Sequence, residues 1–308
     1  MAKIFFYLLV VPVYILSLIP LRGFYIISDL IAFVMERVVR YRASVVYINL
    51  SRSFPEKSYS ELRKIAHKNY KYITDNFVET IWAVTASEKQ LSKRARIVNP
   101  EVLADIYETG KSAMVVMGHT GNWELLGSFD FYAHKGALGF GNEHVRFLYK
   151  RSKNKTMDML TYWIRDRHDP ATLVESHGAP KFMLKSRHQK NLYFLIADQS
   201  PHPGSKYSVD FLNQPTMMLN GPEQLSKLMD LSVVYLGMEK IARGKYEIRF
   251  TKITENPKGE PDGFITARYA QLLEQDIIKN PSAWLWSHKR WKRTREEINQ
   301  STKIEKNG

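Results

Sequence analysis

Short apolar runs alternate with amphipathic segments between residues 113 and 280, and this alternation limits the folds open to the chain. The apolar runs predict strands, and the amphipathic segments between them predict helices. We expect strands at 113–117, 146–149, 171–174, 192–197, 232–238 and 246–250, and helices at 122–132, 155–167, 178–187 and 263–280. Helices that alternate with strands indicate an α/β sandwich around a mixed, mainly parallel sheet.

A long amphipathic helix is expected upstream of this region, at 58–85, with Ser58 and Glu61 forming a capping arrangement at its start. Before it, Pro55 disfavours helix at Phe54, so the chain should end a helix and turn there. The 308 residues allow one large domain, or one domain with an appendage.

The N-terminal segment is strongly apolar. Residues 4–21 carry no charged side chain and would extend roughly 27 Å as a helix, near the thickness of a membrane hydrocarbon core. Pro12 and Pro20 interrupt this stretch, and a second apolar stretch, 24–35, follows. Three arrangements are open: one tilted spanning helix, two helices lying in one leaflet, or a helix pair buried in the core. We favour a membrane anchor over residues 1–42.

A signal peptide is not expected, because no small-residue cleavage site follows the apolar stretch. More basic residues follow the anchor than precede it, which favours a main domain on the cytoplasmic side. That domain should cover residues 43–292. The remaining 293–308 are charged and poor in apolar residues, and we expect them to form a frayed tail.

The net charge and the lack of cysteine limit the partners and the kinds of site that the chain can have. The net charge of +14 predicts an anionic partner, which on charge alone is nucleic acid, anionic lipid or an acidic carrier protein. We find no nucleic-acid-binding motif, and we expect no nucleic-acid partner. The absence of cysteine excludes disulfides, thiolate zinc sites and a cysteine nucleophile. No cluster of metal ligands is apparent, and we expect no metal.

A histidine and a glutamate stand where a strand is expected to give way to a helix, in Gly118-His119-Thr120-Gly121-Asn122-Trp123-Glu124. An imidazole held by a carboxylate is fixed in one tautomer, so its other nitrogen can take a proton from a hydroxyl group. Positions five apart on a helix point about 140° away from each other. His119 and Glu124 therefore meet only if Glu124 reaches back from the first helical turn. The alternative is a structural histidine with Glu124 solvated near the helix N-terminus.

Other polar groups are candidates for the same site. Asp198 and Gln199 follow a strongly apolar strand, and ligands of α/β sheets bind beyond the carboxyl ends of strands. Alternatively, Asp198 caps the loop that follows. A basic run at 146–155, interleaved with aromatic residues, is either a solvated face or a positive rim for phosphorylated head groups or an acidic carrier. Tryptophans and basic residues also alternate at 284–292, which suits a membrane interface or a segment pinned to the core.

Several blocks, in order along nearly the whole chain, resemble the bacterial lipid A late acyltransferases, the lauroyl/myristoyl transferase family. The histidine–four residues–acid block at His119 and Glu124 is similar to that of the family. The other blocks that carry the resemblance are Asn49–Pro55, Tyr149–Asn154, Arg165, Asp198-Gln199, Phe211–Gly221, Glu274 and Pro281–Lys292.

The resemblance implies the acyltransferase type of α/β sandwich. It also implies O-acyl transfer to a lipid A precursor, with His119 as general base and Glu124 as its orienting partner. The residues it implies as binding or shaping the site are Asn122, Lys150, Arg151, Asn154, Arg165, Asp198 and Gln199. Lys150 stands where the family usually has arginine, so either Lys150 or the neighbouring Arg151 fills that role. Backbone N–H groups at Gly121–Asn122 are a candidate oxyanion site.

No bound cofactor is expected. The co-substrate would be an acyl thioester of acyl carrier protein or coenzyme A, the acceptor a phosphorylated glycolipid, and the location the cytoplasmic side of the inner membrane. Two other functions stay open at this point. One is acyl transfer to another membrane lipid, such as a lysophospholipid or aminolipid. The other is a non-catalytic protein that binds anionic lipid.

Overall fold

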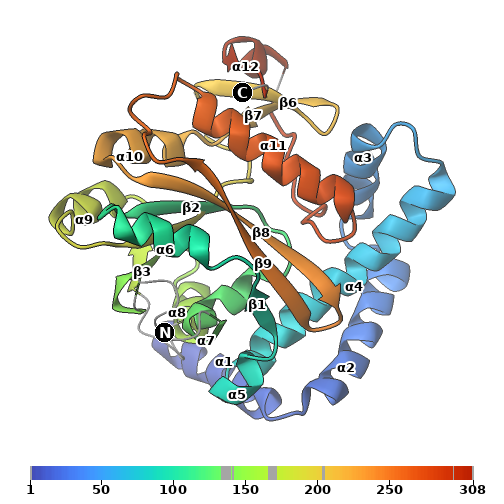
Figure 1. Ribbon diagram of the computed structural model, residues 1–308. Coiled ribbons are helices and arrows are strands. Elements are labelled where there is room, and N and C mark those ends of the chain that lie inside the picture. The colour runs from blue at the N-terminus through green and yellow to red at the C-terminus, as the bar shows by residue number, and fades with distance from the viewer. Residues whose placement is uncertain are drawn as a thin grey trace.

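The computed structural model describes residues 2–132, 140, 142–165, 172–202, 205–293 and 295–306. Within this part, the central sheet has seven strands in the order β1-β9-β8-β2-β5-β3-β4 (Figure 1). All neighbouring strands are parallel except the antiparallel pair β8–β9. The strands are β1 (Ala95–Ile97), β2 (Ala113–Met117), β3 (Val145–Tyr149), β4 (Thr172–Glu175), β5 (Leu192–Ile196), β8 (Ser232–Ala242) and β9 (Lys245–Thr254). The predicted mixed, mainly parallel sheet is confirmed.

Helices cover both faces of the sheet, so its central strands are buried on both sides. All five residues of β2 are buried; Met114 and Val116 join one core, and Val115 and Met117 join the other. Helices α9 (Ala179–Lys185), α10 (Gly221–Met229) and α11 (Phe264–Lys279) pack on the first side. Helix α6 (Glu101–Glu108) and the 3-10 helix η2 (Trp123–Ser128) pack on the second. This is the α/β sandwich that the alternation predicts.

Most expected elements lie within a few residues of their predicted bounds. The predicted helix 122–132 is instead η2 followed by the short α7 (Phe129–Tyr132), and a short 3-10 turn, η3 (Asn142–His144), precedes β3. The predicted helix 155–167 is α8 (Lys155–Arg165). Residues 166, 167 and 171, which we expected in a helix and a strand, lie outside the described part of the chain.

Helix α4 (Tyr59–Ala83) packs against η2 and against the three α-helices that precede it along the chain. Its N-terminus carries the predicted capping box, with the Glu61 carboxylate accepting a hydrogen bond from the Ser58 backbone N–H at 2.8 Å. The preceding α3 (Ala43–Ser53) ends just before Phe54 and Pro55, as expected, and the short α5 (Glu88–Leu91) follows α4.

The N-terminal apolar segment forms two helices, α1 (Ala2–Ser17) and α2 (Leu21–Phe33), the second continuing as a π-helix, η1 (Val34–Val38). Pro12 stays inside α1, whereas Pro20 lies in the break, where the helices bend by 117°. Neither helix alone is long and apolar enough to cross a membrane, and only the bent pair together meets that test by length and composition. A single uninterrupted spanning helix is therefore not what this segment forms.

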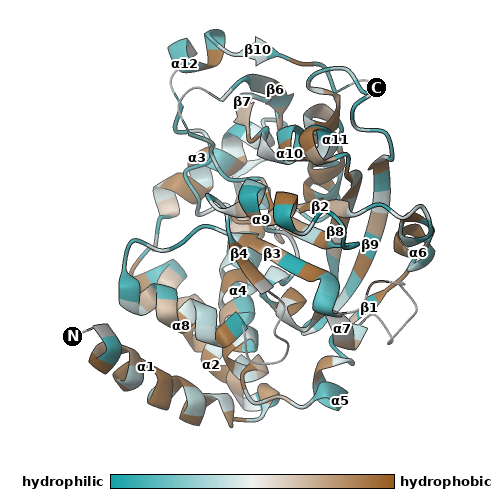
Figure 2. Cartoon of the chain, turned by 90° about the vertical axis from the view of Figure 1, so that its left-hand side faces the viewer, coloured by the Kyte–Doolittle hydropathy of each residue, from teal (hydrophilic) through white to brown (hydrophobic). Residues whose placement is uncertain are grey.

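The two helices are packed differently. On α2, Phe24 is buried against Val78 and Trp82 of α4. On α1, by contrast, Leu8 keeps 63% of its surface exposed. Figure 2 shows α1 as a largely hydrophobic arm at the edge of the molecule.

The C-terminal segment is more regular than its composition predicts. A hairpin of β6 (Tyr207–Phe211) and β7 (Gln214–Met218) forms a second sheet, to which β10 (Thr302–Lys303) adds in parallel beside β6. Helix α12 (Arg295–Asn299) precedes β10, and Ile304 packs against the main core. The described part of the expected frayed tail is thus a structured edge, because Ile304 is partly buried against the core, a contact that the surrounding charges did not indicate.

Candidate active site

A tight turn connects β2 to η2 and carries the histidine motif. Gly121 has φ of +58°, and a Cβ there would lie 2.5 Å from Cγ and 2.7 Å from the backbone oxygen of Met238. Only glycine fits this backbone without strain. The turn is held from α4, where the Asn76 side-chain amide donates to the Gly121 carbonyl at 2.9 Å and the Tyr72 hydroxyl lies 2.6 Å from the same oxygen.

Asp198 is the residue that holds His119. Strands β2 and β5 are parallel neighbours with Met117 opposite Ile196, so the residues that follow them meet at one edge of the sheet. Asp198 Oδ1 lies 2.5 Å from His119 Nδ1, and Oδ2 accepts from the His119 backbone N–H at 2.8 Å. A carboxylate at Nδ1 favours the tautomer with its proton there, which leaves Nε2 unprotonated and able to act as the acceptor.

The surroundings keep Asp198 ionised. Burial alone would raise the pKa of its carboxyl group. Two neighbours outweigh burial and lower this pKa to about 2: His119, through its charge and hydrogen bonds, and Trp284, whose indole N–H donates to Asp198 Oδ2 at 2.8 Å. On the other side of the imidazole, the Gln199 amide nitrogen lies 3.3 Å from Nε2. The Trp123 ring packs edge-on against the imidazole at 4.7 Å. The histidine is therefore fixed on both sides.

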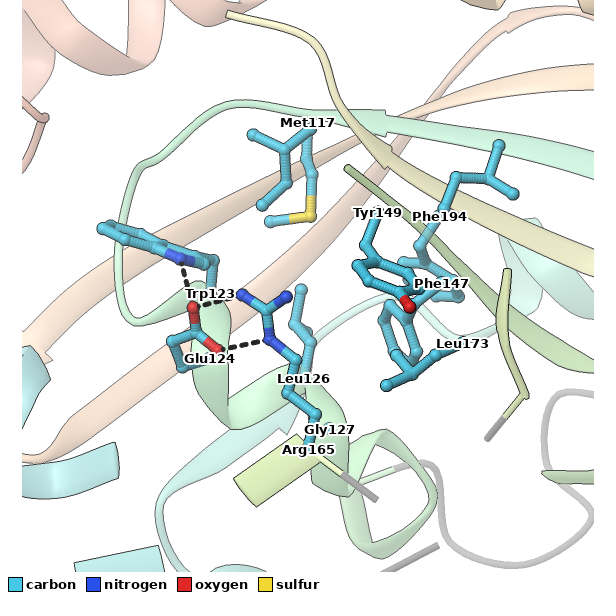
Figure 3. A pocket seen from close by; sticks show the side chains of 12 residues that line it. Met117, Trp123, Glu124, Leu126, Gly127, Phe147, Tyr149, Arg165, Leu173 and Phe194 are labelled. Carbon is cyan, nitrogen blue, oxygen red and sulfur yellow. Dashed lines mark hydrogen bonds and ion pairs between the residues drawn. The ribbon is translucent and has the colours of Figure 1, made fainter. Parts of the chain in front are cut away.

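The predicted contact of Glu124 with His119 is wrong. Glu124 instead forms a two-point ion pair with Arg165, with Arg165 Nη2 2.6 Å from Oε1 and Nε 2.9 Å from Oε2. Burial would raise the pKa of Glu124, but Arg165 outweighs it and the net shift is downward. The physical reason is that η2 starts at Trp123 and directs Glu124 towards the end of α8 (Figure 3). The catalytic role of Glu124 stays a prediction.

Trp123 links the two pairs. Its ring contacts the His119 imidazole, and its indole N–H donates to Glu124 Oε1 at 3.1 Å. The pairs His119–Asp198 and Glu124–Arg165 therefore lie on either side of one tryptophan, and the role of Arg165 in the site stays a prediction.

An inner cavity opens beside the Glu124–Arg165 pair. Its walls are mostly apolar and aromatic (Figure 3), and they comprise Met117, Trp123, Glu124, Leu126, Gly127, Phe147, Leu148, Tyr149, Arg165, Leu173, Phe194 and Ile196. Its volume of about 70 Å³ is below the roughly 300–1,000 Å³ usual for ligand pockets. In this conformation it can hold only the first few carbons of an alkyl chain.

Among the remaining predicted site residues, two asparagines hold the backbone and two basic residues lie at the surface. Asn122 is fully buried and donates to Glu79 at 2.8 Å, so it holds the turn. Asn154 caps α8, with its side-chain oxygen accepting from the Thr156 backbone N–H at 3.0 Å. Lys150 and Arg151 are both exposed, and Arg151 lies 3.4 Å from Glu175. The Gly121–Asn122 oxyanion site stays a prediction.

Glu79 was not among the residues predicted from the sequence. It is 1% exposed, and besides Asn122 it accepts hydrogen bonds from the hydroxyls of Tyr246 at 2.7 Å and Tyr25 at 2.9 Å. Burial raises the pKa of its carboxyl group. The only hint in the sequence was an acidic residue on the apolar side of the helix, next to Val78.

Trp284 was singled out only as part of the aromatic block at 284–292. Its side chain is buried, and the carbonyl groups of Trp284 and Ser282 accept hydrogen bonds from Asn69. This confirms that the block is pinned to the core, where it adds a donor to the site. Within the described residues, no group of three or more histidine or acidic side chains is arranged to hold a metal ion.

Residues 1–293 match the protein family described as bacterial lipid A biosynthesis acyltransferase. The chain is 23% identical over 259 residues to a lipid A biosynthesis lauroyltransferase of Escherichia coli K12, covering 83% of this chain and 81% of that protein. It is 21% identical over 256 residues to a palmitoleoyltransferase from the same organism, covering 82% and 80%. A lipid A biosynthesis acyltransferase of Haemophilus influenzae is 22% identical over 262 residues, covering 83% and 79%.

Proposed function

Because this chain belongs to the bacterial lipid A biosynthesis acyltransferase family, we propose that it moves a fatty acyl chain from an acyl thioester to a hydroxyl group of a lipid A precursor. The observation that carries the proposal is the His119–Asp198 pair at the edge of the sheet, next to an apolar cavity. The pair supplies a base for a hydroxyl group, and the cavity supplies a place for the start of an alkyl chain.

In the proposed reaction, His119 Nε2 takes the proton of the acceptor hydroxyl as its oxygen attacks the thioester carbonyl. Asp198 stabilises the imidazolium that forms. When the tetrahedral intermediate collapses, the carbon–sulfur bond breaks, and the thiol leaves with the proton from Nε2. An ester and a free thiol result, so no acyl-enzyme is needed. A positioned base contributes roughly 10²–10⁴-fold, and positioning of the two substrates must supply much of the rest.

We further propose that the donor is an acyl carrier protein. Four exposed basic residues lie where β3 leads into α8: Lys150, Arg151, Lys153 and Lys155. They follow Tyr149, which lines the inner cavity, and an acidic carrier would be steered to them. The exposed apolar side of α1 supports attachment to the inner membrane, with the catalytic domain on the cytoplasmic side, where acyl thioesters are made.

The test is mass spectrometry of lipid A from the source bacterium with and without this gene. Loss of one fatty acyl mass, restored by the wild-type gene but not by His119→Ala, is the expected result. His177→Ala is the matched control, since that side chain is 82% exposed and lies outside the site. An unchanged lipid A profile in a strain without a second such enzyme would refute the proposal that a lipid A precursor is the acceptor. The total lipid extract would then show whether a lysophospholipid or aminolipid is acylated instead.

A further inference from the structure

A second cavity lies between the N-terminal helix α1 and helix α8, outside the site described above. Figure 2 shows the two helices side by side at the edge of the molecule. The cavity is lined by Phe6, Tyr149, Arg151, Asp158, Met159, Tyr162 and Trp163. Its volume of about 490 Å³ falls within the roughly 300–1,000 Å³ typical of sites for small molecules.

This outer cavity borders the inner one. Tyr149 lines both, and α8 contributes to both, through Asp158 to Trp163 in the outer cavity and through Arg165 in the inner cavity. Arg165 forms an ion pair with Glu124. The residue before Glu124 is Trp123, whose ring packs against the His119 imidazole. A ligand in the outer cavity is therefore separated from the inner cavity by the side chain of Tyr149.

The lining predicts an amphiphile with a negative head group. Phe6, Met159, Tyr162 and Trp163 offer aromatic and thioether surface, which suits an alkyl chain. Arg151 supplies a cation whose side chain is 62% exposed and whose ion pair with Glu175 is long, at 3.4 Å.

Basic residues outnumber acidic ones at this end of the cavity. Asp158 is the acidic residue of the lining, and its Oδ1 accepts a hydrogen bond from the Ser152 backbone N–H at 2.8 Å. Lys150, Lys153 and Lys155 are exposed nearby. The polar end of the cavity therefore has a positive balance, which complements a phosphate group.

Helix α1 offers a path by which a lipid could pass from the membrane to the cavity. Phe6 lines the cavity, whereas Ile4, Leu8 and Ile15 on the same helix are 60–66% exposed. Exposed apolar side chains of this kind lie favourably in the interface of a bilayer. A lipid that leaves the bilayer along α1 would meet the cavity before its alkyl chain enters water.

We propose that the α1–α8 cavity binds the acceptor: it takes an acyl tail of an anionic lipid from the membrane, while Arg151 contacts the phosphate of the head group. The identification of this lipid as the acceptor rests on the proposed function. The binding itself does not, and it can be measured without turnover.

The tail site is tested by Met159→Trp, which fills the cavity. Met157→Trp is the matched control, because Met157 is exposed on the same helix and does not line the cavity. We expect Met159→Trp in the full-length protein to raise the KM for the lipid acceptor about tenfold or more, at unchanged KM for the thioester, and Met157→Trp to behave as wild type. Equal behaviour of the two variants would refute the tail site. A changed donor chain-length preference with unchanged acceptor KM would assign the cavity to the donor and overturn the proposal.

The head-group contact is tested by Arg151→Gln, with Lys258→Gln as control, since Lys258 is an exposed basic residue that does not line the cavity. Binding of the full-length protein to phosphatidylglycerol vesicles should weaken about fivefold in Arg151→Gln, the size expected for one partly exposed ion pair. Binding to phosphatidylcholine vesicles should not change. Equal weakening in Lys258→Gln would show that the loss comes from general surface charge and would refute the contact. Competition by millimolar inorganic phosphate alone, with no requirement for a tail, would refute it as well.

Photocrosslinking separates this proposal from the proposed function. The probe is phosphatidic acid with a diazirine at the end of one tail, added in vesicles to the His119→Ala protein, which cannot turn over. Crosslinks mapped to α1 and α8, and lost in Met159→Trp, would support the cavity even if lipid A proves not to be acylated. Acylation of lipid A without crosslinks at these helices would leave the function standing and overturn the cavity.

Discussion

Asp198 holds His119 at two points, through the imidazole Nδ1 at 2.5 Å and through the backbone N–H at 2.8 Å, although the two residues are 79 positions apart. Their meeting follows from the pairing of β2 with β5, whose carboxyl ends lie at the same level. The orienting carboxylate of the histidine thus comes from the neighbouring strand and not from its own motif. This assignment leads to predictions that differ from those based on Glu124.

Asp198→Asn should lower kcat by roughly 10²–10⁴-fold with a small change in KM, because an amide cannot hold the same tautomer or stabilise the imidazolium. Glu124→Gln keeps the His119–Asp198 pair, so it should change the pH profile of kcat less than Asp198→Asn does. Steady-state kinetics of both variants across pH, with folding checked by circular dichroism, measures this. A pH profile that responds to Glu124→Gln and not to Asp198→Asn would restore Glu124 as the partner.

The stability of the protein should also depend on Asp198 in acid. The pKa of its carboxyl group is about 2 in the folded protein, against an ordinary value of 3.8. A lowered folded pKa contributes stability that is complete above about pH 4 and is lost as the pH falls towards about 2. The difference in unfolding free energy between wild type and Asp198→Asn should therefore shrink from pH 5 to pH 2. Urea unfolding followed by tryptophan fluorescence measures it, and a constant difference would show that the charge of Asp198 is not its origin.

Much of the fold is readable from the sequence because its strands are buried on both faces. The run Ala113–Met117 predicts a strand without alternation, and all five residues are indeed buried. The rule that ligands gather beyond strand ends placed Asp198 near the site. Its partner was not predictable, since the order in which β2 and β5 lie side by side is a property of the assembled sheet.

The β6–β7 hairpin shows why other elements were missed. Its turn has Leu212 and Asn213 at φ of +49° and +59°, where a glycine would have signalled a turn. Pro215 also lies within β7, and proline in a run argues against a strand. The hairpin is stabilised by distant contacts instead, such as the Arg290 guanidinium donating to the Met217 carbonyl at 2.7 Å. The sequence around the hairpin cannot predict a contact with a residue 73 positions away.

Arg165→Lys should impair the site although it keeps the charge. Arginine donates two hydrogen bonds to the two oxygens of Glu124, and lysine cannot reproduce this geometry. Loss of one charged hydrogen bond costs about 1.5–3 kcal/mol, so we expect lower stability and a clear fall in kcat/KM. Arg96→Lys is the control, since Arg96 also donates twice to Glu247 but its side chain is 72% exposed, and it should change little. Thermal unfolding and kinetics compare the two, and equal effects would contradict a special role of the inner pair.

The turn that carries His119 should tolerate no side chain at Gly121. In Gly121→Ala the new Cβ would lie 2.7 Å from the Met238 backbone oxygen, which cannot move aside as a flexible side chain can. Gly110→Ala is the matched control, because Gly110 also has a positive φ, +79°, but nothing lies within 4 Å of the added atom. Backbone strain alone costs about 1–3 kcal/mol, and we expect that cost in both variants.

The clash should add to the strain only in Gly121→Ala. The overpacking should cost about 1–3 kcal/mol more. It should also shift the His119 backbone N–H from Asp198 and reduce kcat. Urea unfolding and kinetics of the two variants separate strain from clash. If Gly121→Ala unfolds at the same urea concentration as Gly110→Ala and keeps its activity, the close approach of this turn to β8 is not what positions the histidine.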